Sequence, residues 1–142
     1  MKLGKSNLDI SPRYPVSMGG YGDRKSKSTG ILDSIYVRTL LFEDDFGKRV
    51  AIISAELIQF SQAQVRQLKE KITQKLDIEK DSIVITATHT HSGPLTVDNL
   101  FMGEADKDYV NWMLEVIPGT VIDALDNLQR CKLGWYQGEF KG

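Results

Sequence analysis

The chain has 142 residues, of which 41% are hydrophobic and 26% are charged, and its formal net charge is −1. This length suits one domain with a substantial core, and we expect residues 1–142 to form it. Acidic and basic residues are interspersed, without the basic block that is typical of nucleic-acid binding. No stretch approaches the roughly 18 consecutive apolar residues of a membrane span. Nucleic acid is therefore not an expected partner, and no transmembrane segment is predicted.

The N-terminus and the cysteine content bear on the cellular compartment. Residues 1–7 carry an early positive charge but lack the apolar stretch of a secretory signal peptide. Cys131 is the only cysteine, which rules out an intramolecular disulfide and slightly favours a reducing compartment. We therefore expect the chain, as it stands, to be cytoplasmic.

The first thirty residues predict a short strand followed by a loop. Leu3, Leu8 and Ile10 lie in a strand-like segment that ends at Ser11-Pro12. Residues 16–30 are rich in glycine, serine and lysine, with three glycines between positions 19 and 22. Such glycines suit positive φ angles or close approach of a ligand, although a flexible loop has the same composition.

A β-hairpin is predicted next, with strands at residues 34–42 and 50–56 joined by a polar turn at residues 43–48. Both arms are rich in β-branched and aromatic residues, and the turn contains aspartate and glycine. The second arm is apolar on both faces as far as Ile53. We therefore expect a central strand that is covered by helices or by another layer.

A strand–helix–strand unit is predicted after the hairpin. Residues 61–64 have the form of a capping box, and apolar residues at intervals of three and four continue the helix to about Leu76. Residues 83–87 form another buried strand. This order predicts a parallel crossover that places Glu56 and His89 at the same carboxyl edge of the sheet.

The last part of the chain predicts a second helix and a final strand. Helical periodicity runs from about Asp106 to Leu128, and Pro118 is expected to kink or divide this helix. Residues 132–140 have strand-like composition. The predicted fold class is α/β: a single domain in which a mixed β-sheet, built from the βαβ unit and the hairpin, carries helices mainly on one face.

The two histidines of the chain stand out as candidate functional residues. His89 and His91 lie two residues apart, where a buried strand runs into a Ser-Gly-Pro turn. On an extended strand their side chains would share one face, about 6.5–7 Å apart. This arrangement suits a metal site or acid–base chemistry, whereas the alternative is a polar pair satisfied near the core. A His-x-His pair is incomplete as a catalytic zinc site, which takes about three protein ligands.

Other candidate site residues come from the edge of the sheet and from the glycine-rich loop. Glu56 could supply a carboxylate ligand, and Asp23, Asp33 or Tyr21 could supply a ligand from the loop region. Arg24 could bind a polar or anionic substrate group. Each of these residues could instead be solvated or act as a structural cap. We predict that Gly20, Tyr21 and Arg24 bind substrate.

Four segments together resemble a known family: residues 8–12, 18–24 (MGGYGDR), 30–38 (GILDSIYVR) and 86–94 (TATHTHSGP). In this order and spacing they resemble the N-terminal part of the neutral/alkaline, non-lysosomal ceramidases, and the similarity covers nearly the whole chain. The resemblance implies a zinc-dependent amidase that hydrolyses the N-acyl bond of ceramide to a fatty acid and a sphingoid base. It further implies that His89 is a zinc ligand and that His91 is catalytic, through a hydrogen bond to the oxyanion or through proton transfer.

The same resemblance implies that this chain holds only part of the site. Family enzymes are several times longer and commonly secreted, and their remaining zinc ligands, a histidine, a glutamate and a tyrosine, follow beyond residue 142. Leu32 occupies a position where many members have a histidine. We therefore expect a fragment of a longer protein or a shortened relative, inactive in isolation, whose partners are a lipid amide and the rest of the chain or a second copy.

Two alternatives remain open at this point. The domain could be a non-catalytic binding or assembly module that keeps the family's scaffold. It could also be a metal-dependent hydrolase of another small amide, with its site completed across an oligomer interface.

Overall fold

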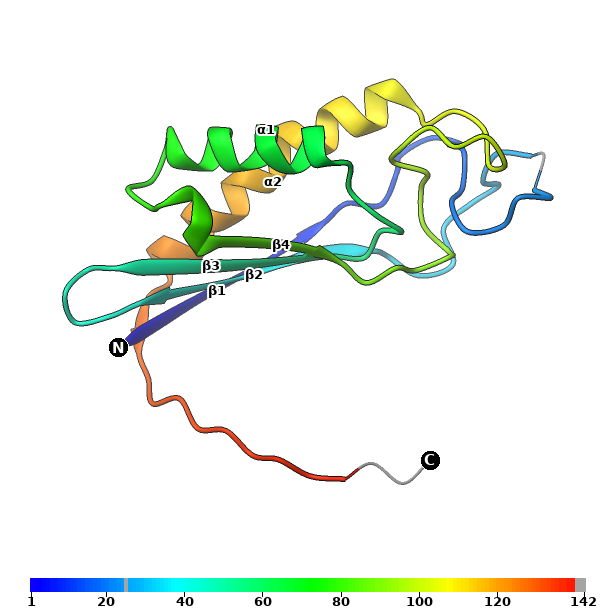
Figure 1. The fold of residues 1–142 in the computed structure, drawn as a ribbon. Helices are drawn as coiled ribbons and strands as arrows, with labels where there is room; N and C mark the ends of the chain where they lie inside the picture. The colour runs from blue at the N-terminus through cyan, green and yellow to red at the C-terminus, as the bar shows by residue number, and fades with distance from the viewer. Residues whose placement is uncertain (25, 140–142) are drawn as a thin grey trace.

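The computed structural model describes residues 1–24 and 26–139. A five-stranded sheet with the strand order β4-β3-β2-β1-β5 carries the two α-helices on one face (Figure 1). The elements are β1 (Lys2–Asp9), β2 (Tyr36–Glu43), β3 (Arg49–Ala55), α1 (Gln62–Thr73), the short 3-10 helix η1 (Lys80–Ser82), β4 (Ile83–Ala87), α2 (Lys107–Asp126) and β5 (Gln129–Arg130). The predicted fold class, α/β with a mixed sheet, is confirmed.

Three antiparallel strands form the first half of the sheet. β1 pairs with β2 along its whole length, and β2 and β3 form the predicted hairpin. At the turn of the hairpin, Asp44 Oδ1 accepts hydrogen bonds from the backbone N–H groups of Phe46 and Lys48. Gly47 adopts a positive φ of 80° there, which glycine accommodates without a Cβ clash. The turn chemistry therefore sets the register of the hairpin.

The crossover unit follows the sequence prediction. The backbone N–H of Gln64 donates to the Ser61 hydroxyl, and the Gln64 side chain accepts from the Ser61 N–H, which completes the capping box. Helix α1 ends at Thr73, three residues before the predicted end at Leu76. β4 then pairs in parallel with β3, with Ala55 opposite Ala87.

Of the two predicted effects of Pro118, a kink or a division, division is wrong, because helix α2 is continuous from Lys107 to Asp126; the kink stays a prediction. Pro118 is buried, and its neighbours Ile117, Thr120 and Val121 are buried as well. Packing of the helix against the sheet therefore outweighs the loss of one backbone hydrogen bond at the proline. None of the helices in the described part of the chain is long and apolar enough to span a membrane.

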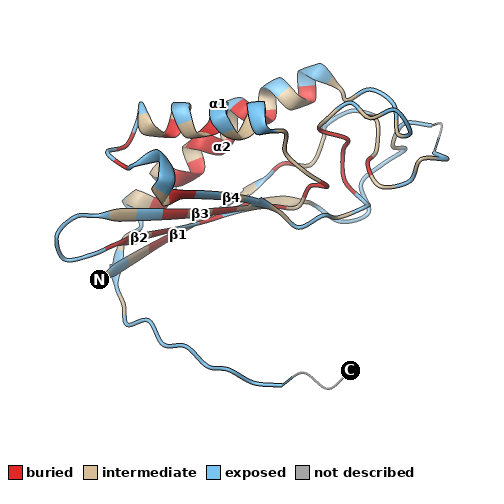
Figure 2. Ribbon diagram, viewed as in Figure 1, coloured by how far each residue is buried: buried red, intermediate tan, exposed pale blue. Residues whose placement is uncertain are grey.

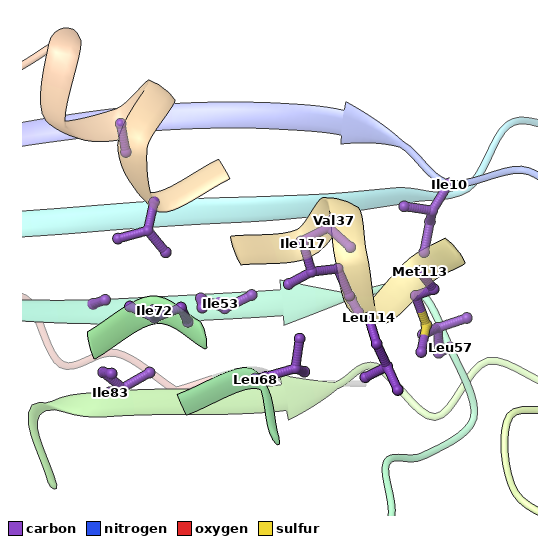
Figure 3. Packing of buried hydrophobic residues seen from close by; sticks show 14 of the residues in the cluster. Ile10, Val37, Ile53, Leu57, Leu68, Ile72, Ile83, Met113, Leu114 and Ile117 are labelled. Carbon is purple, nitrogen blue, oxygen red and sulfur yellow. The ribbon is translucent and has the colours of Figure 1, made fainter. Parts of the chain in front are cut away.

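The hydrophobic core fills the space between the helices and one face of the sheet (Figures 2 and 3). Alternate residues of the strands point into it, as the twofold repeat of a strand requires. The Thr39 and Thr120 hydroxyls also lie in this layer, 2.6 Å apart, where β2 meets α2. Because the Thr120 hydroxyl donates to the carbonyl oxygen of Ile117, it accepts its second hydrogen bond from Thr39. The largest fully buried core side chains include Ile10, Leu41, Ile53, Leu57, Leu68, Ile72, Tyr109, Met113 and Ile117.

The other face of the sheet is not covered by a helix (Figure 1). Leu40, Val50 and Val84 lie on this face and are 39%, 43% and 49% exposed. The prediction that β3 is central is confirmed by its place between β2 and β4. Both α-helices pack on the same side of the sheet, which confirms the predicted placement of the helices mainly on one face.

The prediction of a final strand at residues 132–140 is also wrong. β5 comprises only Gln129 and Arg130, which pair with the start of β1. Residues 131–139 follow as an extended trace without strand pairing, on the side of the sheet away from the helices (Figure 1). Trp135 and Tyr136 are 88% and 93% exposed there. Phe140, the last residue of the predicted strand, lies outside the described residues.

Gly4 marks the closest approach of β1 to α2. A Cβ added at Gly4 would lie 1.8 Å from the backbone oxygen of Ala124. We therefore expect Gly4→Ala to lower the free energy of unfolding by about 2–3 kcal/mol, because strand and helix must move apart. Gly119→Ala is the matched control, since nothing lies within 4 Å of its added Cβ. In a helix this change should raise stability by about 0.5–1 kcal/mol. Urea denaturation measures both variants, and equal stabilities would contradict the packing argument.

The lowered pKa of Asp106 predicts that this residue contributes to folding stability in a pH-dependent way. It is the N-cap of α2, and the backbone N–H of Tyr109 lowers its pKa from the ordinary 3.8, with help from the Tyr14 hydroxyl and Lys27. A lowered pKa in the folded state stabilises the protein above the unfolded pKa, and this contribution is lost as pH falls through the folded pKa. Asp106→Ala should cost about 1 kcal/mol at neutral pH.

Asp106→Asn separates charge from capping, because asparagine also caps helices well. The difference in unfolding free energy between wild type and Asp106→Asn should shrink as pH falls below about 4. Denaturation series at several pH values measure it. A difference that stays constant down to pH values well below the folded pKa would show that the carboxylate charge contributes nothing.

Candidate functional site

The candidate site is built where β3 and β4 leave the sheet side by side. Because the two strands are parallel, both end at the same edge. Their pairing continues past the strand ends, where Thr88 N–H donates to Ala55 O at 2.9 Å and His89 N–H donates to Leu57 O at 3.0 Å. The sequence prediction that Glu56 and His89 share this edge is confirmed.

His89 adopts a left-handed backbone conformation with φ of 62°. β4 ends at Ala87, so the extended strand assumed from the sequence does not reach the histidine pair. The His89 side chain is fixed by its Nδ1 atom, which lies 2.8 Å from the carbonyl oxygen of Ile58. A carbonyl only accepts hydrogen bonds, so Nδ1 carries a proton, and in the neutral imidazole Nε2 then keeps its lone pair.

His91 lies against His89 despite the irregular backbone. The ring centroids are 5.2 Å apart with an interplanar angle of 64°. The Tyr21 ring also packs perpendicular to His91, with centroids 5.6 Å apart, and the guanidinium of Arg24 lies 5.4 Å from the centroid of the Tyr21 ring. The predicted proximity of the two imidazoles is therefore confirmed, although its expected cause, an extended strand, is wrong.

The glycine-rich loop is attached to the histidine segment through the backbone. Gly19 N–H donates to Gly93 O at 3.0 Å, and Leu95 N–H donates to Ser17 O at 2.8 Å. Gly20 has a φ of 102°, and a Cβ added there would lie 2.4 Å from the His91 Cβ. Only glycine fits this contact, so the loop brings Gly20, Tyr21 and Arg24 to the histidines. Their predicted role in substrate binding stays a prediction.

Glu56 does not turn toward the histidines as a ligand would. Its Oε2 accepts the backbone N–H of Tyr36 at 2.8 Å, and its Oε1 lies 2.5 Å from Arg38 Nη1. These bonds hold its carboxylate against β2. Asp23 and Asp33 are exposed, and the described residues contain no group of three or more histidine, cysteine, aspartate or glutamate side chains suited to a metal. A full metal shell is thus not assembled from the described residues.

A cavity of about 530 Å³ lies beside the histidine segment. The histidine rings do not line it, but the residues between and beside them do. Sequence reasoning missed these hydroxyl-bearing residues, although their alternation with the histidines in Thr88-His89-Thr90-His91-Ser92 was a usable signal. Leu32, at 97% exposure, forms part of the cavity wall. Hydroxyl or carboxylate side chains in the lining are Ser11, Ser28, Asp33, Ser34, Glu56, Thr88, Thr90 and Ser92.

Two imidazoles and a partly polar cavity at the carboxyl edge of parallel strands define an α/β protein with a polar site at a sheet edge. The family model described as "Neutral/alkaline non-lysosomal ceramidase, N-terminal" matches residues 1–141. The chain belongs to this family, which confirms the resemblance seen in the sequence.

Individual relatives agree with the family assignment. The neutral ceramidases of Drosophila melanogaster and Drosophila pseudoobscura pseudoobscura are each 28% identical to the chain over 96 residues, which is 66% of this chain and 14% of each relative. The crystal structure of neutral ceramidase from Pseudomonas aeruginosa matches 90% of this chain and 22% of its own, with a TM-score of 0.80 and 23% identity. A ceramidase structure complexed with C2 matches equally well, with 21% of its chain covered. The chain therefore has the fold of part of a ceramidase and spans about one seventh of its curated relatives.

Gly20 provides a test of the site geometry. Gly20→Ala places a methyl group against His91, in a backbone conformation that alanine rarely adopts. We expect the imidazole proton resonances of His91 to shift in NMR spectra. Because the chain has two histidines, a His91 variant assigns both resonances. Gly22→Ala is the control, since its nearest contact would be an ordinary 3.5 Å. Identical histidine spectra in wild type and Gly20→Ala would contradict the contact.

Proposed function

We propose that this chain contributes one corner of the active site of a ceramidase-like, zinc-dependent amidohydrolase acting on the N-acyl bond of ceramide or a related lipid amide. The observation that carries the proposal is the hydrogen bond that orients the His89 ring. Its Nδ1 is tied to the Ile58 carbonyl oxygen at 2.8 Å, which leaves Nε2 as the ligand atom. Metal-ligating histidines are commonly oriented by such a hydrogen bond from the second ring nitrogen.

The donor set in the described residues fits one zinc ligand. His89 is exposed at the sheet edge, so its Nε2 is accessible to a metal. The other ligands would come from further chain or from a second copy of this one. A zinc ion supplies Lewis acidity and lowers the pKa of water toward neutrality, which is the chemistry that amide hydrolysis needs.

His91 is suited to moving a proton or donating a hydrogen bond next to His89. His91 is exposed, and its ring contacts the rings of His89 and Tyr21, which restrict its orientation. An imidazole can exchange protons near neutral pH and can donate to an oxyanion that develops on the substrate. Gly20 leaves the room that this ring position requires.

The cavity beside the histidines suits an amphipathic substrate. Thr90 and Ser92 provide hydroxyl groups on one side, while Ile31 and Leu32 provide apolar surface. A lipid amide combines hydrogen-bonding groups at its head with apolar chains, so this mixed lining matches its chemistry. The names of the relatives, neutral ceramidases, are the reason for proposing ceramide within this class.

Zinc binding tests the proposed ligand. We expect weak zinc binding by the wild-type chain, since one or two histidines hold the metal poorly without the remaining ligands. His89→Ala should abolish this binding without unfolding the domain, because the side chain is exposed. Calorimetric titration with zinc measures affinity, and thermal denaturation checks the fold. His91→Asn is the control, and it should retain more zinc affinity than His89→Ala.

Hydrolysis of a short-chain ceramide, with and without zinc, separates the proposed function from the alternatives. Zinc binding through His89 without turnover supports a contribution to a larger site. Turnover that requires both zinc and His89 supports a site completed between copies. Binding of zinc that survives His89→Ala, or no zinc binding at all, rejects the proposal and favours a non-catalytic module.

A further inference from the structure

Glu56 lies between the end of β3 and the segment that holds His89. β3 ends at Ala55, and the two carbonyl groups that bind His89 belong to Leu57 and Ile58. One accepts the backbone N–H of His89 at 3.0 Å, and the other lies 2.8 Å from its Nδ1 atom. The direction of both carbonyls therefore depends on how the chain leaves β3 at Glu56.

Glu56 is bonded to β2 through its backbone and through its side chain. Its N–H donates to the Tyr36 carbonyl at 2.9 Å, and its Oε2 accepts the Tyr36 N–H at 2.8 Å. Its Oε1 lies 2.5 Å from Arg38 Nη1, and the Arg38 guanidinium lies 5.1 Å from the centroid of the Tyr36 ring. We call these bonds of Glu56 to Tyr36 and Arg38 the Glu56 clamp. The clamp holds the first residue beyond β3 against the first residues of β2.

The carboxylate of the Glu56 clamp is only partly accessible to water. The Glu56 side chain is 28% exposed. Hydrogen bonds to an ionised group are stronger than those between neutral groups, and partial burial reduces their screening by salt. Both oxygens are bonded to residues of β2, so the carboxylate acts on His89 through the backbone of residues 56–58.

The strained backbone of His89 makes this support necessary. A φ of 62° is unfavourable for a residue with a Cβ, and such conformations persist only where the surrounding structure over-determines them. The surrounding bonds come from residues 55–58, because the Ala55 carbonyl also accepts the Thr88 N–H at 2.9 Å. If residues 56–58 could shift, His89 would relax toward a negative φ and its ring would leave the Ile58 carbonyl.

The chain that follows the histidines also packs on Glu56. A Cβ added at Gly93 would lie 3.3 Å from the Glu56 carbonyl oxygen and 3.3 Å from Thr90 Cγ2. The backbone of Glu56 is therefore close to residues on both sides of His91. A displacement of Glu56 would disturb the whole histidine segment.

We infer that Glu56 is a positioning residue: its clamp on β2 fixes the Leu57 and Ile58 carbonyls and thereby keeps the proton of the neutral His89 imidazole on Nδ1. The inference rests on the proposed function, since a lone pair on Nε2 is what a metal ligand needs. The positioning itself requires neither metal nor substrate. In this role Glu56 serves the site without contacting the reacting groups.

The tautomer of His89 tests the inference directly. Imidazole nitrogen chemical shifts distinguish the two tautomers in mildly alkaline solution, where imidazoles are neutral, and His91→Asn assigns the signals. We expect the Nδ1–H form to predominate in the wild-type chain. Glu56→Ala should lower the ratio of the Nδ1–H form to the Nε2–H form by roughly ten-fold, the factor that one hydrogen bond of ordinary net strength supplies.

Two further variants separate the reach of the Glu56 side chain from its charge. Glu56→Gln keeps the length and an oxygen that can accept the Tyr36 N–H, so it should retain the wild-type tautomer ratio. Glu56→Asp keeps the charge but is one methylene shorter, so it should resemble Glu56→Ala, and it carries the test if Glu56→Ala does not fold. The reverse order would mean that the carboxylate acts on the imidazole by charge, which overturns the positioning role.

Glu43→Ala is the matched control for a loss of stability alone. Glu43 also joins strands through its carboxylate, which pairs with Lys2 at 2.8 Å and with Arg49 at 2.9 Å, but it lies at the opposite end of β2. We expect a lower melting temperature and an unchanged His89 tautomer. An equal change of tautomer in Glu43→Ala overturns the inference.

Two other results would also overturn the role of Glu56. One is a wild-type chain in which the Nε2–H form of His89 predominates. The other is a wild-type tautomer ratio in Glu56→Asp and in folded Glu56→Ala. No zinc or lipid enters these measurements. A chain that shows the expected tautomers but binds no zinc would therefore reject the proposed function alone.

Discussion

Parallel pairing of β3 with β4 is the constraint on which the candidate site depends. The register that places Ala55 opposite Ala87 makes both strands end together. The pairing then continues to Leu57, whose carbonyl accepts the His89 N–H. A histidine and a carbonyl that lie about thirty residues apart in the chain are thereby set side by side, and the Ile58 carbonyl reaches His89 Nδ1. Without the crossover through α1, neither contact would form.

The glycine-rich loop completes the arrangement from the opposite side. Its backbone bonds to residues 93 and 95 tie it to the segment after the histidines. Gly20 then allows the loop to touch His91 directly. Main-chain hydrogen bonds from β3 and from the glycine-rich loop thus position the histidine segment. The arrangement therefore depends little on exposed, flexible side chains.

Much of the fold was predictable from local sequence patterns. The hairpin turn, the capping box at Ser61 and the alternation of apolar residues each specify one element, and their order predicts the crossover. Pro118 does not divide α2, because burial of the helix against the sheet outweighs a local helix-breaking tendency. Residues 132–140 led to the prediction of a strand that does not form. Their composition suits a strand, but a strand also needs a partner, and pairing ends at Arg130.

The proximity of several candidate site residues was predictable, but the geometry that brings them together was not. The family motifs brought together His89, His91, Gly20 and Tyr21, which the structure places in one cluster. The orientation of Glu56 away from that cluster depends on its bonds to Tyr36 and Arg38, which no local pattern encodes. The left-handed turn at residue 89 depends in the same way on the carbonyl groups that surround it.

The left-handed backbone at residue 89 is less stable with a histidine than with a glycine. A histidine with a φ of 62° costs roughly 1 kcal/mol more than glycine would in the same conformation. Folding stability alone would favour glycine or asparagine at position 89. Sequence drift toward a more stable fold therefore leads toward loss of the imidazole. Position 89 therefore balances a relaxed backbone, which glycine would give, against an imidazole at the edge of the sheet.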